Sequence, residues 1–146
     1  RGDTDSELFF HLFLSFLHDS GSLDQSPNSA AATRAALRAT ISLIERLRAE
    51  AGASGNGMNL LVTDGEHMVA VHGSVTMGYQ VIKGRPDLER LLGDDTLRRI
   101  RIPDMASCRF CLVASDFDDE PRGWTTVAPH AIVTITRTDD PTVEDL

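Results

Sequence analysis

Two groups of residues have types and spacing that could do chemistry, and the first lies at the start of the chain. Thr4, Asp5, Ser6 and Glu7 place two hydroxyls and two carboxylates immediately before an apolar run. The Thr-x-x-Glu spacing is that of a capping box, which predicts the start of a helix. The positive end of a helix dipole favours the ionised form of a carboxylate in the first turn.

The second group is Cys108 and Cys111, which form a C-x-x-C pattern of the kind found in redox and zinc sites. They fall in Ser107–Ser115, which predicts a buried strand, and residues three apart in a strand point to opposite faces. Two such thiols could neither pair nor bind one metal ion, and zinc would need further ligands nearby. We therefore expect two buried free cysteines, no metal and no cofactor, in a reducing, cytoplasmic compartment. A thiol redox or zinc protein remains the alternative if both cysteines share one face.

The histidines give weaker signals. His11 and His18 fall on the polar strip of the first predicted helix, and His67 and His72 fall on opposite faces of one predicted strand. We expect solvated or core histidines rather than metal ligands. The chain also lacks the glycine-rich motifs that bind phosphates.

Two helices are predicted to position the first group. The pattern predicts one helix over Asp5–His18 and a second, with a single buried stripe, over Ala30–Glu50. At ~100° per residue, the apolar side chains of the first helix sweep about two-thirds of its circumference. A surface helix needs a much narrower stripe. We therefore expect this helix to be covered on two sides.

The remainder of the chain predicts strands and one short helix. Asp64-Gly65 is a typical hairpin turn between two of the strands. The predicted strands are Met58–Thr63, His67–His72, Tyr79–Lys83, Ser107–Ser115 and Ala131–Arg137, and the short helix is Pro86–Leu92. This order predicts an α+β fold in which helices lie on one face of a mostly antiparallel sheet.

That sheet is expected to need cover on both faces. Leu60–Val62 and Phe110–Val113 are apolar at successive positions, so both of their faces are predicted to be buried. The chain does not supply enough elements to do this alone. Residues 138–146 predict an acidic tail without regular structure.

Composition bounds the kinds of partner. The chain has 146 residues, 41% of them hydrophobic, and a formal net charge of −8, which suits one globular domain. It has no cluster of Lys and Arg of the kind that binds nucleic acid. It has no apolar run of the roughly 20 residues that span a bilayer and no secretory signal. We expect neither nucleic acid nor a membrane as a partner.

The segment Gly2-Asp3-Thr4-Asp5-Ser6-Glu7 resembles the Thr-Asp-Ser/Thr-Glu element of class II glutamine amidotransferases. These are N-terminal-nucleophile hydrolases with a four-layer αββα sandwich. The order of the later elements, with Met58–Gly65, Val113–Asp116 and Gly123-Trp124, extends the similarity over most of the chain. It is similar to the subgroup that includes the γ-glutamyl-hydrolysing enzyme of ergothioneine biosynthesis.

The resemblance implies that residues 1–137 are the C-terminal part of such a domain, half of its sandwich, followed by the tail. It implies that Asp5 binds the α-ammonium of glutamine, with Thr4 as a second candidate. In the family, the nucleophile is an N-terminal cysteine whose own amino group is the base. An arginine binds the substrate carboxylate, and an Asn-Gly pair stabilises the oxyanion.

All of those groups precede the Thr-Asp-Ser-Glu element in the family, and none can be assigned here. Asn56-Gly57 follows the second helix and is interpreted as a turn, and Cys108 and Cys111 lie in a strand. We therefore expect no catalytic residue in this chain. The missing N-terminal half would be a separate chain, a cleaved neighbour or a preceding segment.

The predicted function is hydrolysis of a γ-glutamyl amide, of glutamine or a conjugate, with this chain contributing substrate binding. The alternative is a non-catalytic binding or scaffolding protein of the same fold, in which Asp5 and Glu7 only cap a helix. The expected partners are the missing half and the amide substrate, and a homo-oligomer is left open. Because the first helix is so apolar, the chain alone is not expected to be a stable, soluble domain.

Overall fold

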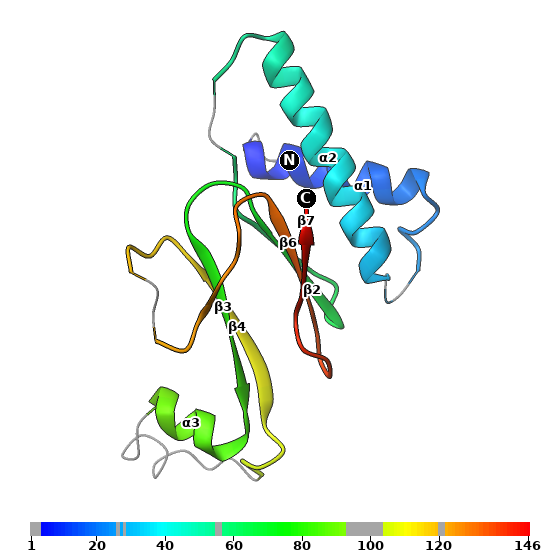
Figure 1. Cartoon of the computed structure of the whole chain (residues 1–146). Helices are drawn as coiled ribbons and strands as arrows, with labels where there is room; N and C mark the ends of the chain where they lie inside the picture. Colours follow the sequence, from blue (N-terminus) through cyan, green and yellow to red (C-terminus); the bar gives the residue numbers. More distant parts are fainter. Residues whose placement is uncertain (1–3, 26, 28, 55–56, 93–103, 120–121) are drawn as a thin grey trace.

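The computed structural model describes residues 4–25, 27, 29–54, 57–92, 104–119 and 122–146 (Figure 1). Helix α1 spans Asp5–Asp19 and helix α2 spans Ala30–Glu50. Each begins at a hydroxyl side chain that accepts a hydrogen bond from a backbone N–H three residues later, Thr4 for α1 and Ser29 for α2. Such caps satisfy one of the unpaired donors of a helix start, which is why both helices begin where the sequence predicts.

The strands form two antiparallel sheets, which we call sheet A and sheet B. Sheet A has four strands in the order β1-β2-β6-β7, and sheet B has three in the order β4-β3-β5. Helix α3, Gly84–Leu92, follows β3 at one end of sheet B. The strands of sheet A are β1 (Leu60–Thr63), β2 (His67–His72), β6 (Ala131–Thr136) and β7 (Thr142–Asp145). Those of sheet B are β4 (Arg109–Ser115), β3 (Met77–Lys83) and β5 (Thr125–Thr126).

The core explains how the layers stack. Val69 and Val71 of β2 pack with α1 and α2 on one face of sheet A, whereas Ala70 between them packs with sheet B on the other face. On β6, Ile132 faces the helices and Val133 faces sheet B. This period of two buries both faces of the central strands. The molecule thus has a helix layer and two sheet layers (Figure 1).

This architecture confirms the predicted α+β fold and fits half of an αββα sandwich. It corrects the expectation of one sheet with an uncovered second face, because sheet B covers that face of sheet A at β2 and β6. The strands buried on both faces are therefore β2 and β6. In β1, Leu61 is 49% exposed, and the side chains of β4 are only half-buried.

The prediction that residues 138–146 lack regular structure is wrong. β7, Thr142–Asp145, pairs with β6, and Val143 lies opposite Val133. Glu144 forms ion pairs with Arg34 and Arg38 of α2, the latter at 3.3 Å between Arg38 Nη2 and Glu144 Oε2. Glu144 is thus paired with a helix more than 100 residues away in sequence, and a pattern within the segment could not reveal this.

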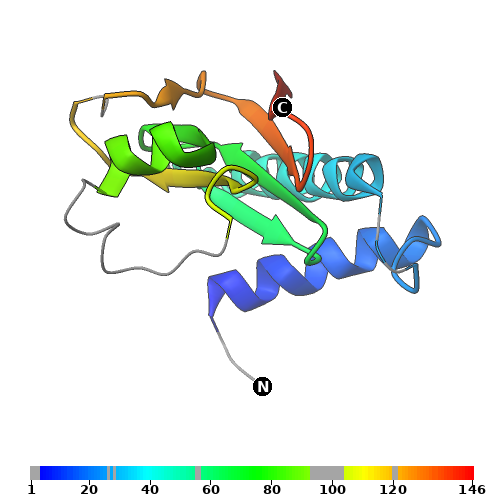
Figure 2. The same cartoon turned by 90° about the horizontal axis from the view of Figure 1, so that it is seen from below.

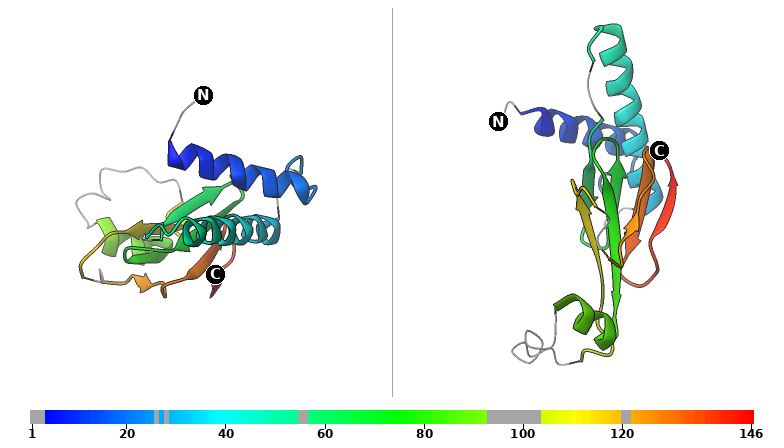
Figure 3. Two further views of the ribbon diagram at one scale, coloured as in Figure 1. Left: turned by 90° about the horizontal axis from the view of Figure 1, so that it is seen from above. Right: turned by 60° about the vertical axis from the view of Figure 1, so that its left-hand side comes forward.

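Two views show that α1 lies on the side of β1. Figure 2 shows α1 (blue) beside the β1–β2 hairpin, with β6 and β7 (orange and red) beyond it. Figure 3 gives the same arrangement from above, and its right-hand view shows the start of α1 projecting past the sheets on the side away from β7. The helix start that carries Asp5 therefore overhangs the sheets.

A close approach of two backbone segments fixes the end of β2. A Cβ added to Gly73 would lie 2.4 Å from the carbonyl oxygen of Met58. The side chain of Asn59 holds the same segments together, because its Oδ1 accepts from the N–H groups of Gly73 and Ser74, at 3.0 Å each. Only a residue without a side chain fits at Gly73.

We expect Gly73→Ala to lower the free energy of unfolding by about 1–3 kcal/mol, because backbone atoms must move to admit the methyl group. Ser74→Ala is the matched control, since Ser74 is exposed and its backbone N–H would remain. Its effect should stay within about 0.5 kcal/mol. Urea unfolding of the assembled protein measures both, and equal effects would contradict the proposed clash.

Candidate functional site

The predicted site is the first turn of α1. Thr4 Oγ1 accepts a hydrogen bond from the backbone N–H of Glu7 at 3.3 Å, and the N–H of Leu8 donates to the Thr4 carbonyl at 3.1 Å. The predicted Thr4-to-Glu7 cap is therefore present. Glu7 Oε1 lies 3.6 Å from Nε2 of His11, one turn further along. Thr4 and Glu7 thus organise the helix start around Asp5.

Asp5 is exposed at this helix start. Its Oδ1 accepts from the backbone N–H of Ser6 at 2.8 Å, while Oδ2 has no hydrogen-bond partner within the part of the chain that the structure describes. A carboxylate with one anchored oxygen and one available oxygen at the positive end of a helix can accept hydrogen bonds from an ammonium group.

A cavity lies beside Phe9, a residue close to Asp5 in sequence, but it is too small to hold a substrate. Phe9, one turn after Asp5, lines a cavity of about 30 Å³ together with Gly57, Gly73 and His130. That volume is enough for one or two water molecules, and Asp5 does not line it. Asp5 therefore has the chemistry to bind one end of a substrate, but these residues do not enclose it.

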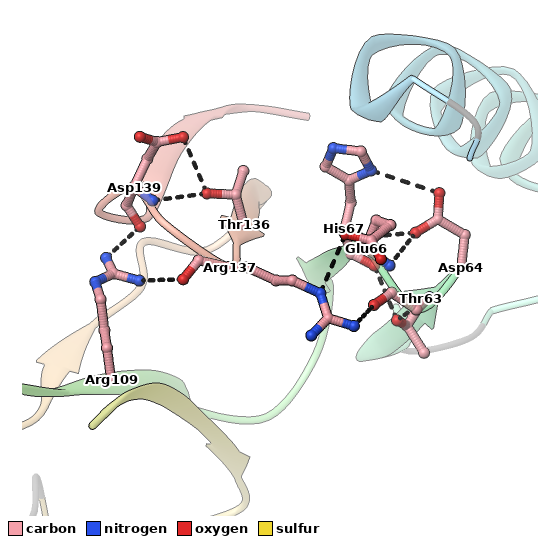
Figure 4. Close-up of polar contacts among 9 residues, drawn as sticks. Thr63, Asp64, Glu66, His67, Arg109, Thr136, Arg137 and Asp139 are labelled. Carbon is pink, nitrogen blue, oxygen red and sulfur yellow. Dashed lines mark hydrogen bonds and ion pairs between the residues drawn. The ribbon is translucent and has the colours of Figure 1, made fainter. Parts of the chain in front are cut away.

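A second polar cluster, which sequence patterns did not indicate, lies around His67 at the start of β2, the end of that strand away from Gly73 (Figure 4). It lines an open cleft of about 370 Å³ between the β1–β2 hairpin, β4 and β6. Arg137 donates to the Gly65 carbonyl at 2.7 Å and pairs with Glu66 at 3.1 Å. Arg109 donates to the carbonyl of Arg137 at 3.3 Å. The residues come from segments far apart in the chain, so no local spacing could have found them.

The cluster connects separate segments of the fold and is not a binding site. Both arginines are engaged by carbonyls and carboxylates that join the hairpin, β4 and the β6–β7 turn. Burial opposes ionisation of Asp64, but hydrogen bonds from the backbone N–H groups of His67 and Glu66 outweigh it, so the pKa of Asp64 lies below its usual value. Asp64 is thus ionised at neutral pH and holds the hairpin turn.

The other histidines do not form a site. His11 and His18 are exposed, whereas His72 is buried and its Nδ1 lies 2.8 Å from the Val127 carbonyl. Over the described ranges, no three His, Cys, Asp or Glu side chains are placed to hold a metal ion. No helix within those ranges is long and apolar enough to cross a membrane.

The two cysteines lie in different clusters. Cys108 precedes β4 and packs with Ile82 and Leu88, whereas Cys111 lies in β4 and packs against the core between the sheets. Both are free, as expected, but only half-buried, which corrects the expected burial. Burial raises the pKa of the Cys111 thiol, and the charge of Arg109 only partly offsets this effect. Cys111 is therefore protonated at neutral pH and is a poor nucleophile.

We expect thiol titration in denaturant without reductant to find Cys108 and Cys111 both free, because their side chains enter separate clusters. A zinc measurement on the same sample should show no bound metal. One disulfide or one equivalent of zinc would contradict the placement of these two side chains.

Comparison with known proteins is informative for the fold. No protein-family model matches the chain, and no curated protein matches it in sequence. Among solved structures, it is similar to a glutamine aminotransferase class-II domain protein from Silicibacter pomeroyi, with a TM-score of 0.58 and 19% sequence identity. The match covers 99% of this chain and 52% of that chain. The chain therefore has a class II glutamine amidotransferase-like fold and spans about half the length of the structure that it matches.

Proposed function

We propose that this chain is the substrate-binding half of a class II glutamine amidotransferase-like domain that hydrolyses the γ-amide of glutamine or of a γ-glutamyl conjugate. One observation carries the proposal. Within a chain of this fold, the exposed carboxylate of Asp5 lies in the first turn of α1, with one oxygen available to a ligand. The γ-glutamyl-hydrolysing subgroup is the finer assignment that the order of the later elements favours.

The role of Asp5 follows from charge and position. The α-ammonium of an amino acid carries three N–H donors and a positive charge, and an ionised carboxylate is its natural acceptor. Ser6 holds Asp5 Oδ1, so the carboxylate has a fixed orientation. Thr4 acts through the helix start, because its hydroxyl oxygen accepts from the Glu7 N–H. We therefore assign ammonium binding to Asp5 and positioning to Thr4.

The nucleophile is proposed to come from the remaining half of the domain. An N-terminal cysteine there would attack the γ-carbonyl carbon, form a thioester and release ammonia, and water would then hydrolyse the thioester to glutamate. Cys111 cannot replace it, because its thiol lies within a strand and stays protonated. The two unpaired cysteines support a reducing, cytoplasmic location.

Glutamine hydrolysis by the assembled domain tests the proposal. The assay follows release of glutamate and ammonia in equal amounts, with and without replacement of the N-terminal cysteine of the complementary half by serine. We expect turnover only with cysteine. Glutamine binding without turnover, in a complex that has no N-terminal cysteine, would instead establish the alternative of a non-catalytic binding protein.

A further inference from the structure

The start of α1 carries apolar side chains that the described part of the chain leaves exposed. Phe9, Phe13 and Leu17 face the core, but Leu8 is 66% exposed and Phe10 is 50% exposed. Fully burying a Leu or Phe side chain is worth about 1.5–3 kcal/mol. Both residues lie in the first two turns of α1, and the start of this helix projects past the sheets (Figure 3). A further structural element packed against the start of α1 would bury this exposed apolar area.

The strand next to that overhang has a free edge. β1 is the outermost strand of sheet A and pairs only with β2 within the described part of the chain. Leu61 lies opposite Ala70 in register, yet Ala70 is fully buried and Leu61 is 49% exposed. Sheet B therefore covers β2 but stops short of β1.

The helix surface and the strand edge meet in one groove. Phe10 and Phe13 of α1 form one wall, and Val62 and Thr63 of β1 form part of the other, around a volume of about 150 Å³. A strand added to the free edge of β1 would lie beneath Phe10. On its other face, its side chains would extend the cover over Leu61. One element could therefore bury both Phe10 of α1 and Leu61 of β1.

The opposite edge of sheet A differs in chemistry. β7 carries Glu144 and Asp145 and is exposed along its length, and charges on an edge strand discourage further pairing. β1 has the sequence Leu-Leu-Val-Thr, without a charge. Such an uncharged edge beside an apolar helix surface favours strand addition. Of the two edges of sheet A, that of β1 is the one open to a partner.

We propose that the remaining half of the amidotransferase-like domain docks on this surface by adding a strand to the free edge of β1 beneath α1. The inference rests on the proposed function for the identity of the occupant. The matched structure has about half of its length outside the match, which is enough chain to supply such strands. A second copy of this chain is disfavoured, because each copy carries a net charge of −8. Docking here would bring the nucleophile-bearing half to the end of α1 that carries Asp5.

Site-specific photo-cross-linking tests the surface. A benzophenone amino acid is placed singly at Phe10, Leu61 or Val143 in the protein produced in its own cells, and the cross-linked peptides are identified by mass spectrometry. Val143 is the matched control, since it is 47% exposed but lies on β7. We expect positions 10 and 61 to cross-link to one and the same segment of the complementary half, and position 143 not to do so.

The outcomes separate the surface from the function. Cross-links between copies of this chain, cross-links at position 143 alone, or none at positions 10 and 61 would overturn the docking surface. A shared segment at positions 10 and 61 in a polypeptide without an N-terminal cysteine would keep the surface and overturn the proposed function. As a second measurement, Leu61→Lys should reduce retention of the complementary half at least ten-fold, whereas Val143→Lys should leave it unchanged. Equal retention in both variants would also overturn the surface.

Discussion

Residues 1–146 produced alone are expected to bind an apolar-surface dye and to self-associate instead of remaining monomeric. Leu8, Phe10 and Leu61 are each about half exposed or more, and they lie on neighbouring elements, α1 and β1. Exposed apolar surface of this kind promotes aggregation. The free edge of β1 adds unpaired backbone groups that can template further strands. Dye fluorescence and light scattering after size-exclusion chromatography would measure both effects.

A double variant identifies the surface responsible. Leu8→Gln with Phe10→Gln should lower dye binding several-fold, because these two side chains are at least half exposed. Val143→Gln should not change it, although Val143 is similarly exposed. A monomeric, cooperatively melting wild-type chain that binds no dye would contradict the prediction. It would mean that the exposed residues of α1 need no partner.

The helices were predictable because their signals are local. The Thr4-to-Glu7 cap and the apolar periodicity both lie within the helix that they specify, and α1 starts at Asp5 as expected. The same holds for α2, whose predicted bounds Ala30–Glu50 are confirmed. The hairpin at Asp64-Gly65 was also predictable, since it depends on the turn residues alone.

The division into two sheets and the ordering of β7 depend on distant contacts. The segment Thr142–Asp145 has two acidic residues, which by themselves favour a solvated tail. It forms a strand because β6 offers a partner edge and because Arg34 and Arg38 neutralise Glu144. Neither fact is visible within the segment. Likewise, the cleft around Arg109 and Arg137 assembles from segments of β1, β2, β4 and β6.

The candidate site was predictable only in part, because some of its features depend on local sequence signals and others on tertiary contacts. The position of Asp5 in the first turn of α1 follows from the capping pattern, and the structure places it there, exposed. Its surroundings do not follow, since the small cavity beside Phe9 is built from α2, β2 and the loop at His130. The overhang of α1 is also a tertiary feature. It changes the interpretation of the apolar helix, because the start of α1 projects past the sheets instead of lying between layers.

Asp5→Asn is expected to lower kcat/KM for glutamine by about ten- to a hundred-fold in the assembled domain. The physical reason is loss of a charge-assisted contact to the α-ammonium, worth roughly 1.5–3 kcal/mol. Asparagine keeps the size of the side chain, and its Oδ1 can still accept from the Ser6 N–H as Asp5 does at 2.8 Å. The free energy of unfolding should therefore fall by less than about 1 kcal/mol, the usual worth of a charge at a helix start.

Thr4→Ala provides the opposite pattern and so separates substrate binding from helix capping. It removes the oxygen that accepts from the Glu7 N–H at 3.3 Å, and the loss of such a cap costs about 1 kcal/mol of stability. Affinity for glutamine should be largely kept, since the carboxylate of Asp5 remains. Steady-state glutaminase kinetics and thermal melts of both variants measure the two effects side by side. Full activity in Asp5→Asn, with a stability loss like that of Thr4→Ala, would reduce Asp5 to a helix-start residue and remove the one site residue assigned to this chain.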